Sequence, residues 1–148
     1  MKFDKGEIDF LISRTFEDNP TIEYTFEHNN ITQIIKIETP KEIISKKIFH
    51  RASEFTMRDI FDAAAVLEKN ASALHDLSPD VIEKLPLVID RITIFRDEYS
   101  KEIERDITPS DVPDCVLRQG PEIVIEALSL ELKKEKKIPK EQDKGQGL

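Results

Sequence analysis

Glycine and cysteine are both scarce in this sequence of 148 residues. Its only four glycines are Gly6, Gly120, Gly145 and Gly147, and none lies in a glycine-rich loop of the kind that cradles phosphates with backbone amides. The single cysteine, Cys115, excludes an intramolecular disulfide and is typical of a reducing compartment. A nucleotide-binding P-loop and a disulfide scaffold are therefore excluded.

Long apolar runs are also missing. No run approaches the roughly 18 residues that a membrane span needs, and the N-terminus lacks the basic and apolar regions of a signal peptide. We therefore expect a cytoplasmic protein that is not associated with a membrane. Its formal net charge of −8 disfavours non-specific nucleic-acid binding, because the average field repels phosphate.

The first 38 residues alternate between apolar and polar side chains, which is typical of β-strands. The segments with this alternation are 7–12, 22–26 and 31–37. Turn-forming residues separate them at 18–20 and 28–30. The pattern predicts three antiparallel strands in a small N-terminal sheet fragment, residues 1–38.

Two helix starts follow the strands. Thr39, Pro40 and Glu42 form a capping-box pattern, with threonine at the N-cap and glutamate reaching back to the N-cap amide, so a helix should begin at Pro40. Thr56 and Asp59 predict a second capped helix, which should run to about residue 69. Residues 39–137 are thus expected to form a helical domain.

The later helices are predicted from apolar spacing and from proline positions. We expect a short helix over 70–76, a long helix from Pro79 that Pro86 kinks or divides, and a last helix opened by Gly120 and Pro121. The polar residues 138–148 are expected to form a disordered tail. The fold class is therefore α+β, with a small antiparallel sheet followed by a bundle of four to five helices. The side chains expected to be buried are Ile8, Phe10, Ile37, Ile44, Phe61, Leu67, Leu85, Ile92, Phe95 and Leu128.

Lys47 is unusual because helical periodicity places it in the apolar stripe of its helix. It could lay its methylenes along this stripe and extend its ammonium to water, or it could point its charge at a functional site. Arg58 and Asp62 have salt-bridge spacing, and Asp59 can act as a helix-capping residue, so a structural explanation also covers these three residues.

The spacing of these residues nevertheless resembles a known pattern. Glu42 and Lys47 form E-x4-K, Arg51 follows, and Arg58 to Asp62 form R-D-x-x-D. This pattern resembles the AbiEii/AbiGii toxin family of nucleotidyltransferases over about the first half of the chain. The resemblance implies a polymerase-β-like catalytic core, a role in a bacterial toxin-antitoxin or abortive-infection system, and a cognate antitoxin. It also implies nucleoside triphosphate and tRNA as substrates.

The resemblance also implies roles for individual residues. Lys47, Arg58, Asp59 and Asp62 would be catalytic, and Lys47 and Arg51 would bind the nucleotide. Asp9 lies where the third Mg²⁺-binding carboxylate would be, although it could equally be a solvated strand residue. The family's glycine turn and D-x-D metal motif are missing from this sequence. We therefore expect a truncated form that is inactive alone and would use Mg²⁺ only as part of a complete protein.

An alternative from another functional class is a non-catalytic helical module that binds an antitoxin or another protein. A sheet that begins near Met1 would present an unpaired edge, and proteins seldom leave such an edge uncovered. This alternative predicts association with a partner, or a homo-oligomer formed through the exposed sheet edge.

Overall fold

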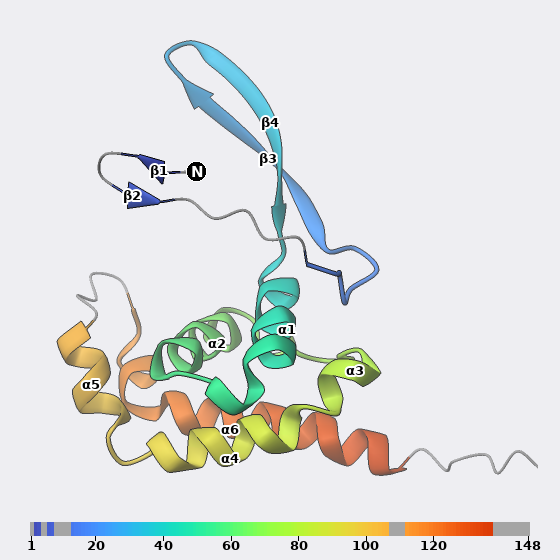
Figure 1. The fold of residues 1–148 in the computed structure, drawn as a ribbon, viewed down its shortest axis with the longest axis vertical. Coiled ribbons are helices and arrows are strands. Elements are labelled where there is room, and N and C mark those ends of the chain that lie inside the picture. The colour runs from blue at the N-terminus through green and yellow to red at the C-terminus, as the bar shows by residue number, and fades with distance from the viewer. Residues whose placement is uncertain (1, 4–5, 8–12, 107–111, 138–148) are drawn as a thin grey trace, which may run out of the picture.

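The computed structural model describes residues 2–3, 6–7, 13–106 and 112–137. It has an α+β fold in which a two-stranded antiparallel hairpin precedes a group of packed helices (Figure 1). Strands β1 (Lys2–Phe3) and β2 (Gly6–Glu7) form a second, very short antiparallel pair.

The hairpin consists of strands β3 (Thr21–His28) and β4 (Ile31–Glu38). Asn29 and Asn30 connect them and have positive φ angles of 50° and 63°. Two consecutive residues in this conformation form the type I′ turn that matches the twist of a hairpin, and asparagine tolerates it well. The hairpin stands away from the helices (Figure 1), so its length is not packed against them.

Of the predicted three-stranded sheet, the described residues contain the second and third strands, which pair with each other. There β3 pairs only with β4, and β1 pairs only with β2. Each pair is joined by a short local connection, so neither needs a third strand to set its register. Most of the predicted first strand, residues 8–12, lies outside the described residues.

The two predicted capped helices are confirmed. Helix α1 (Pro40–Arg51) begins after Thr39, and α2 (Met57–Lys69) begins after Thr56, with the one-turn 3-10 helix η1 (Ala52–Glu54) between them. The capping box of α2 is complete, since Thr56 and Asp59 each accept a hydrogen bond from the other's backbone amide.

The prediction that a proline would divide the next helical segment is also confirmed. Helix α3 (Pro79–Ile82) is separated from α4 (Leu85–Phe95), and Pro86 occupies the first turn of α4, where its missing amide hydrogen is not needed. Helix α5 (Tyr99–Asp106) follows. The predicted short helix over 70–76 is wrong. That segment forms turns, because the Asn70 side chain accepts hydrogen bonds from Ser72 and competes with helical bonding.

The last helix, α6 (Asp114–Lys137), begins six residues before the predicted start and contains Pro121 in its interior. Interior proline normally costs about 3 kcal/mol. Here Val116 and Leu117 lie in the core, so burial stabilises the turn before the proline. Gly120 has no Cβ to crowd the proline ring, which further reduces the strain.

The core lies among the helices, mainly between α2, α4, α5 and α6. Of the side chains expected to be buried, six are buried, namely Ile44, Phe61, Leu67, Leu85, Ile92 and Leu128. Phe95 packs against the core but is only partly buried. Ile37 is 37% exposed, so that prediction is wrong, because no helix covers its hairpin face. Ile8 and Phe10 lie outside the described residues.

Candidate functional site

The Lys47 side chain points at two carboxylates of the neighbouring helix. Its Nζ lies 3.0 Å from Oδ1 of Asp59 and 2.5 Å from Oδ2 of Asp62. Lys47 is on helix α1, and both aspartates are in the first two turns of α2. Lys47 therefore does not simply extend to water, and we call Lys47, Arg51, Arg58, Asp59 and Asp62 the lysine–aspartate cluster.

Asp59 is the most deeply buried member of this cluster, with 1% of its side chain exposed. Its Oδ2 accepts hydrogen bonds from the Thr56 backbone amide at 3.0 Å and from the Thr56 hydroxyl at 2.9 Å. The same oxygen lies 3.3 Å from a guanidinium nitrogen of Arg51. The Thr56 amide, the Thr56 hydroxyl and the Arg51 guanidinium are all hydrogen-bond donors. A buried carboxylate needs such donors to stay ionised.

These contacts shift two pKa values in opposite directions. Burial alone would lower the pKa of Lys47, but hydrogen bonds and charge from Asp62 and Asp59 outweigh it, so the pKa is raised. Burial alone would raise the pKa of Asp59. Hydrogen bonds from Thr56 and Lys47 outweigh it, and the net pKa is lowered. Both groups are therefore charged at neutral pH.

The two arginines of the cluster are more exposed. Arg51 is 46% exposed, and Arg58 is 69% exposed and reaches Asp62 at 3.6 Å. The structure thus brings together all of the predicted catalytic residues, Lys47, Arg58, Asp59 and Asp62, with the predicted nucleotide-binding Arg51. Three cationic and two anionic side chains give this cluster a formal charge of +1 in a chain of net charge −8.

The predicted metal ligand Asp9 lies outside the described residues. Within the described residues, no three His, Cys, Asp or Glu side chains gather in a way that could hold a metal ion. The carboxylates of Asp59 and Asp62 do not fit Mg²⁺ by themselves, because the ammonium of Lys47 already lies between them.

Glu42, the glutamate of E-x4-K, has a role that its sequence position did not indicate. Its predicted bond to the Thr39 amide is absent, because that amide donates to the carbonyl oxygen of Pro20. The fully buried Glu42 carboxylate instead accepts from the backbone amides of Phe16 at 3.1 Å and Glu17 at 3.0 Å. Glu42 therefore anchors the segment before the hairpin to α1.

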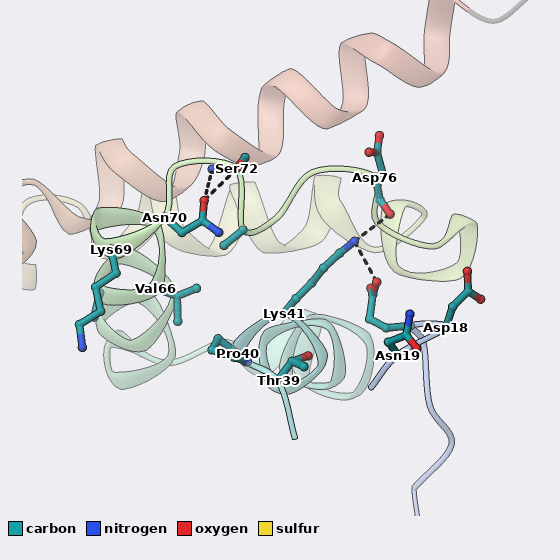
Figure 2. Close-up of a pocket in the computed structure, with 13 residues that line it drawn as sticks. Asp18, Asn19, Thr39, Pro40, Lys41, Val66, Lys69, Asn70, Ser72 and Asp76 are labelled. Carbon is teal, nitrogen blue, oxygen red and sulfur yellow. Dashed lines mark hydrogen bonds and ion pairs between the residues drawn. The ribbon is translucent and has the colours of Figure 1, made fainter. Parts of the chain in front are cut away.

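A separate groove of about 830 Å³ lies beside the start of α1, the end of α2 and the turn segment that follows (Figure 2). Lys41 extends across it, donates to the backbone carbonyl of Asp76 at 3.2 Å and pairs with Glu17 at 2.8 Å. No member of the lysine–aspartate cluster lines this groove. The charged residues that line the groove are two lysines and three carboxylates, which gives a formal charge of −1. The groove is therefore a less suitable anion site than the cluster.

A second surface lies on one face of the hairpin. Directly opposed residues share a face, and the register pairs Ile22 with Ile37, Tyr24 with Ile35 and His28 with Ile31. The large apolar side chains on this face are Ile22, Tyr24, Phe26, Ile31, Ile35 and Ile37, all between 37% and 61% exposed. The alternation that predicted the strands also contained this signal, because it put all of the large apolar residues except Ile34 on one side.

In the described part of the chain, no helix combines the length and the apolar character needed to cross a membrane. Comparison with known proteins found no matching family model, no similar characterised protein and no similar solved structure. Fold and site together define a helical domain that carries an amphipathic β-hairpin and a partly buried lysine–aspartate cluster.

Proposed function

We propose that this chain is a nucleotidyltransferase toxin-like protein in which the lysine–aspartate cluster forms one wall of a nucleotide site. The observation that carries the proposal is the position of Lys47, whose ammonium contacts Asp59 and Asp62. Lys47 is the lysine of E-x4-K, and the two aspartates are those of R-D-x-x-D. The AbiEii/AbiGii resemblance assigns these same residues to the active site and implies a polymerase-β-like origin for the fold.

The charge of the cluster supports an anionic ligand. Lys47 would act as a point charge on a phosphate, while the exposed guanidinium groups of Arg51 and Arg58 can give the forked hydrogen bonds that phosphate oxygens accept. Asp59 would hold the lysine in place rather than touch the phosphate, since only 1% of its side chain is exposed. Asp62, which is 32% exposed, could face the ligand directly.

The missing glycine turn and D-x-D motif limit what this chain can do alone. Both are needed in the resembled family to grip the triphosphate and two Mg²⁺ ions, and neither is present in these 148 residues. We therefore propose weak nucleotide binding without transfer. The implied tRNA acceptor, toxin role and cognate antitoxin belong to this same proposal.

Nucleotide binding can be tested by titrating the isotope-labelled chain with ATP, GTP, CTP and UTP and following backbone amide shifts. We expect shifts in α1 and α2 near Lys47, at millimolar affinity, that Lys47→Met weakens at least fivefold. Lys101→Met is the matched control, because Lys101 is exposed on α5 and belongs to no cluster. Equal binding by both variants, or no shifts near Lys47, would refute the nucleotide site.

Transfer can be tested separately. The chain, Mg²⁺, labelled nucleoside triphosphates and total tRNA should yield no labelled RNA. Robust labelling that Lys47→Met abolishes would show that the chain holds triphosphate and metal unaided, and the proposed incompleteness would then be wrong.

A second candidate function is a non-catalytic interaction module. The exposed apolar face of the hairpin favours it, because a contiguous apolar patch on a protein surface is often a contact site for another molecule. In this candidate function, the lysine–aspartate cluster would only hold α1 against α2.

A further inference from the structure

The hairpin has three properties that together point to a ligand. It is a two-stranded ribbon, it projects from the helices (Figure 1), and one of its faces is apolar and exposed. An isolated two-stranded hairpin is at best marginally stable in water, so a third strand or a covering layer would stabilise it. Within the described residues, both long edges of the hairpin lack a neighbouring strand.

The size of the apolar face disfavours face-to-face packing with a second copy of this chain. Eight residues per strand at about 3.3 Å each, and two strands about 4.8 Å apart, give a face of roughly 26 by 10 Å, or about 260 Å². Two such faces packed together would bury roughly 500 Å², whereas a stable interface buries about 1,200 Å² or more. An occupant that also pairs with the strand edge would gain backbone hydrogen bonds in addition to this area.

The charges of the polar face distinguish the two edges. Glu23 and Glu27 lie on β3, whereas Lys36 is on β4 opposite Glu23. The other charged residue on this face of β4, Glu38, already pairs with Lys46 of α1. A two-residue turn makes His28 and Ile31 a hydrogen-bonded pair, so the amides of Glu23, Thr25 and Glu27 point outward from the β3 edge. A strand added there would place alternate side chains beside Glu23 and Glu27, where positive charge is favourable.

We propose that the β3 edge binds an extended segment of a basic partner protein. Its apolar side chains would continue the face formed by Ile22, Tyr24 and Phe26, and its lysine or arginine side chains would pair with Glu23 and Glu27. The net charge of −8 would also attract a basic segment over a longer range. This inference rests on the second candidate function, the interaction module, and is independent of the nucleotide site.

The probe for this site is a capped nine-residue peptide of alternating valine and lysine. Its controls are a valine–glutamate peptide of the same pattern, and a peptide of the same composition with its valines and lysines in separate blocks. Each is titrated into the isotope-labelled full chain. We expect the alternating basic peptide alone to bind, and to slow hydrogen exchange of the Glu23, Thr25 and Glu27 amides at least tenfold.

Two matched variants test the face. Tyr24→Thr removes an apolar side chain from the apolar face, and Ile34→Thr removes one from the polar face, where Ile34 is 67% exposed. We expect the first to weaken peptide binding at least fivefold and the second to change it less than twofold. Glu23→Gln combined with Glu27→Gln should also weaken binding of the basic peptide. All three replace side chains outside the helical core, so helical circular dichroism should not change.

Several outcomes would overturn the inference in distinguishable ways. If the valine–glutamate peptide binds as well as the basic one and Tyr24→Thr abolishes both, the basic partner is wrong but the interaction module stands. If no peptide slows hydrogen exchange of the β3 amides, the basic partner and the interaction module are both wrong. Dimerisation of the free chain in sedimentation at 10–200 µM, lost in Tyr24→Thr, would identify a second copy as the occupant instead.

Discussion

Replacing Lys47 with methionine is the sharpest test of the lysine–aspartate cluster. Methionine retains an unbranched apolar side chain but leaves Asp59, which is 1% exposed, without its ammonium partner. Removing one partner of a buried ion pair costs about 3–5 kcal/mol. Lys47 is 23% exposed and Asp59 keeps Thr56 and Arg51 as partners, so we expect a smaller loss of about 2 kcal/mol.

The measurement is urea unfolding of the full chain at pH 7, followed by helical circular dichroism. Arg58→Met is the matched control, because Arg58 pairs with Asp62 of the same cluster but is 69% exposed. Exposed i,i+4 pairs contribute about 0.5 kcal/mol or less, so this variant should stay close to the parent. Equal unfolding free energies for the two variants would refute the argument that burial makes Lys47 important.

The pH dependence supplies a second readout. The pKa of Asp59 is lowered in the folded chain, so its contribution is present above the unfolded value of about 3.9 and is lost as pH falls through the folded pKa. The pKa of Lys47 is raised, so its contribution is present below about 10.4 and is lost as pH rises through the folded pKa. The cost of Lys47→Met should therefore be constant between about pH 5 and 9 and shrink outside that window. A cost that stays constant down to pH 3 would contradict an ionic origin.

Three further changes test the packing around the site. Gly120→Ala should destabilise the chain by about 1–3 kcal/mol, because the new Cβ would lie 2.6 Å from Cζ of the fully buried Tyr99; a neutral effect in urea unfolding would mean that the ring can move. Tyr99→Phe should cost about 1 kcal/mol, because it removes a buried hydroxyl that donates to a backbone carbonyl at 2.8 Å; no change would show that this bond is not stabilising. Glu42→Gln should cost about 2 kcal/mol and speed hydrogen exchange of the Phe16 and Glu17 amides, and unchanged exchange there would contradict the anchoring role.

Features that depend on neighbours in sequence were predictable. Thr39 and Thr56 cap their helices because a hydroxyl reaches an amide three residues later, whatever the rest of the chain does. Pro86 divides a helical segment for the equally local reason that it has no amide hydrogen. The alternation in residues 22–26 and 31–37 likewise predicted both strands of the hairpin.

Features that depend on distant packing were not predictable. Proline at position 121 predicts a helix start, yet burial of Val116 and Leu117 outweighs its cost and the helix continues through it. Glu42 has the spacing of a capping residue, but the Thr39 amide already has a distant partner, so the carboxylate anchors another segment.

For the candidate site, the sequence alone placed Lys47, Asp59 and Asp62 on two successive helices and left two orientations open for the lysine. Only the packing of α1 against α2 decided that its ammonium lies between the two carboxylates. The same holds for the hairpin. Its alternation determined which side chains share a face, but whether helices cover that face depends on where the hairpin leaves the helical body, and only the tertiary structure decides that direction.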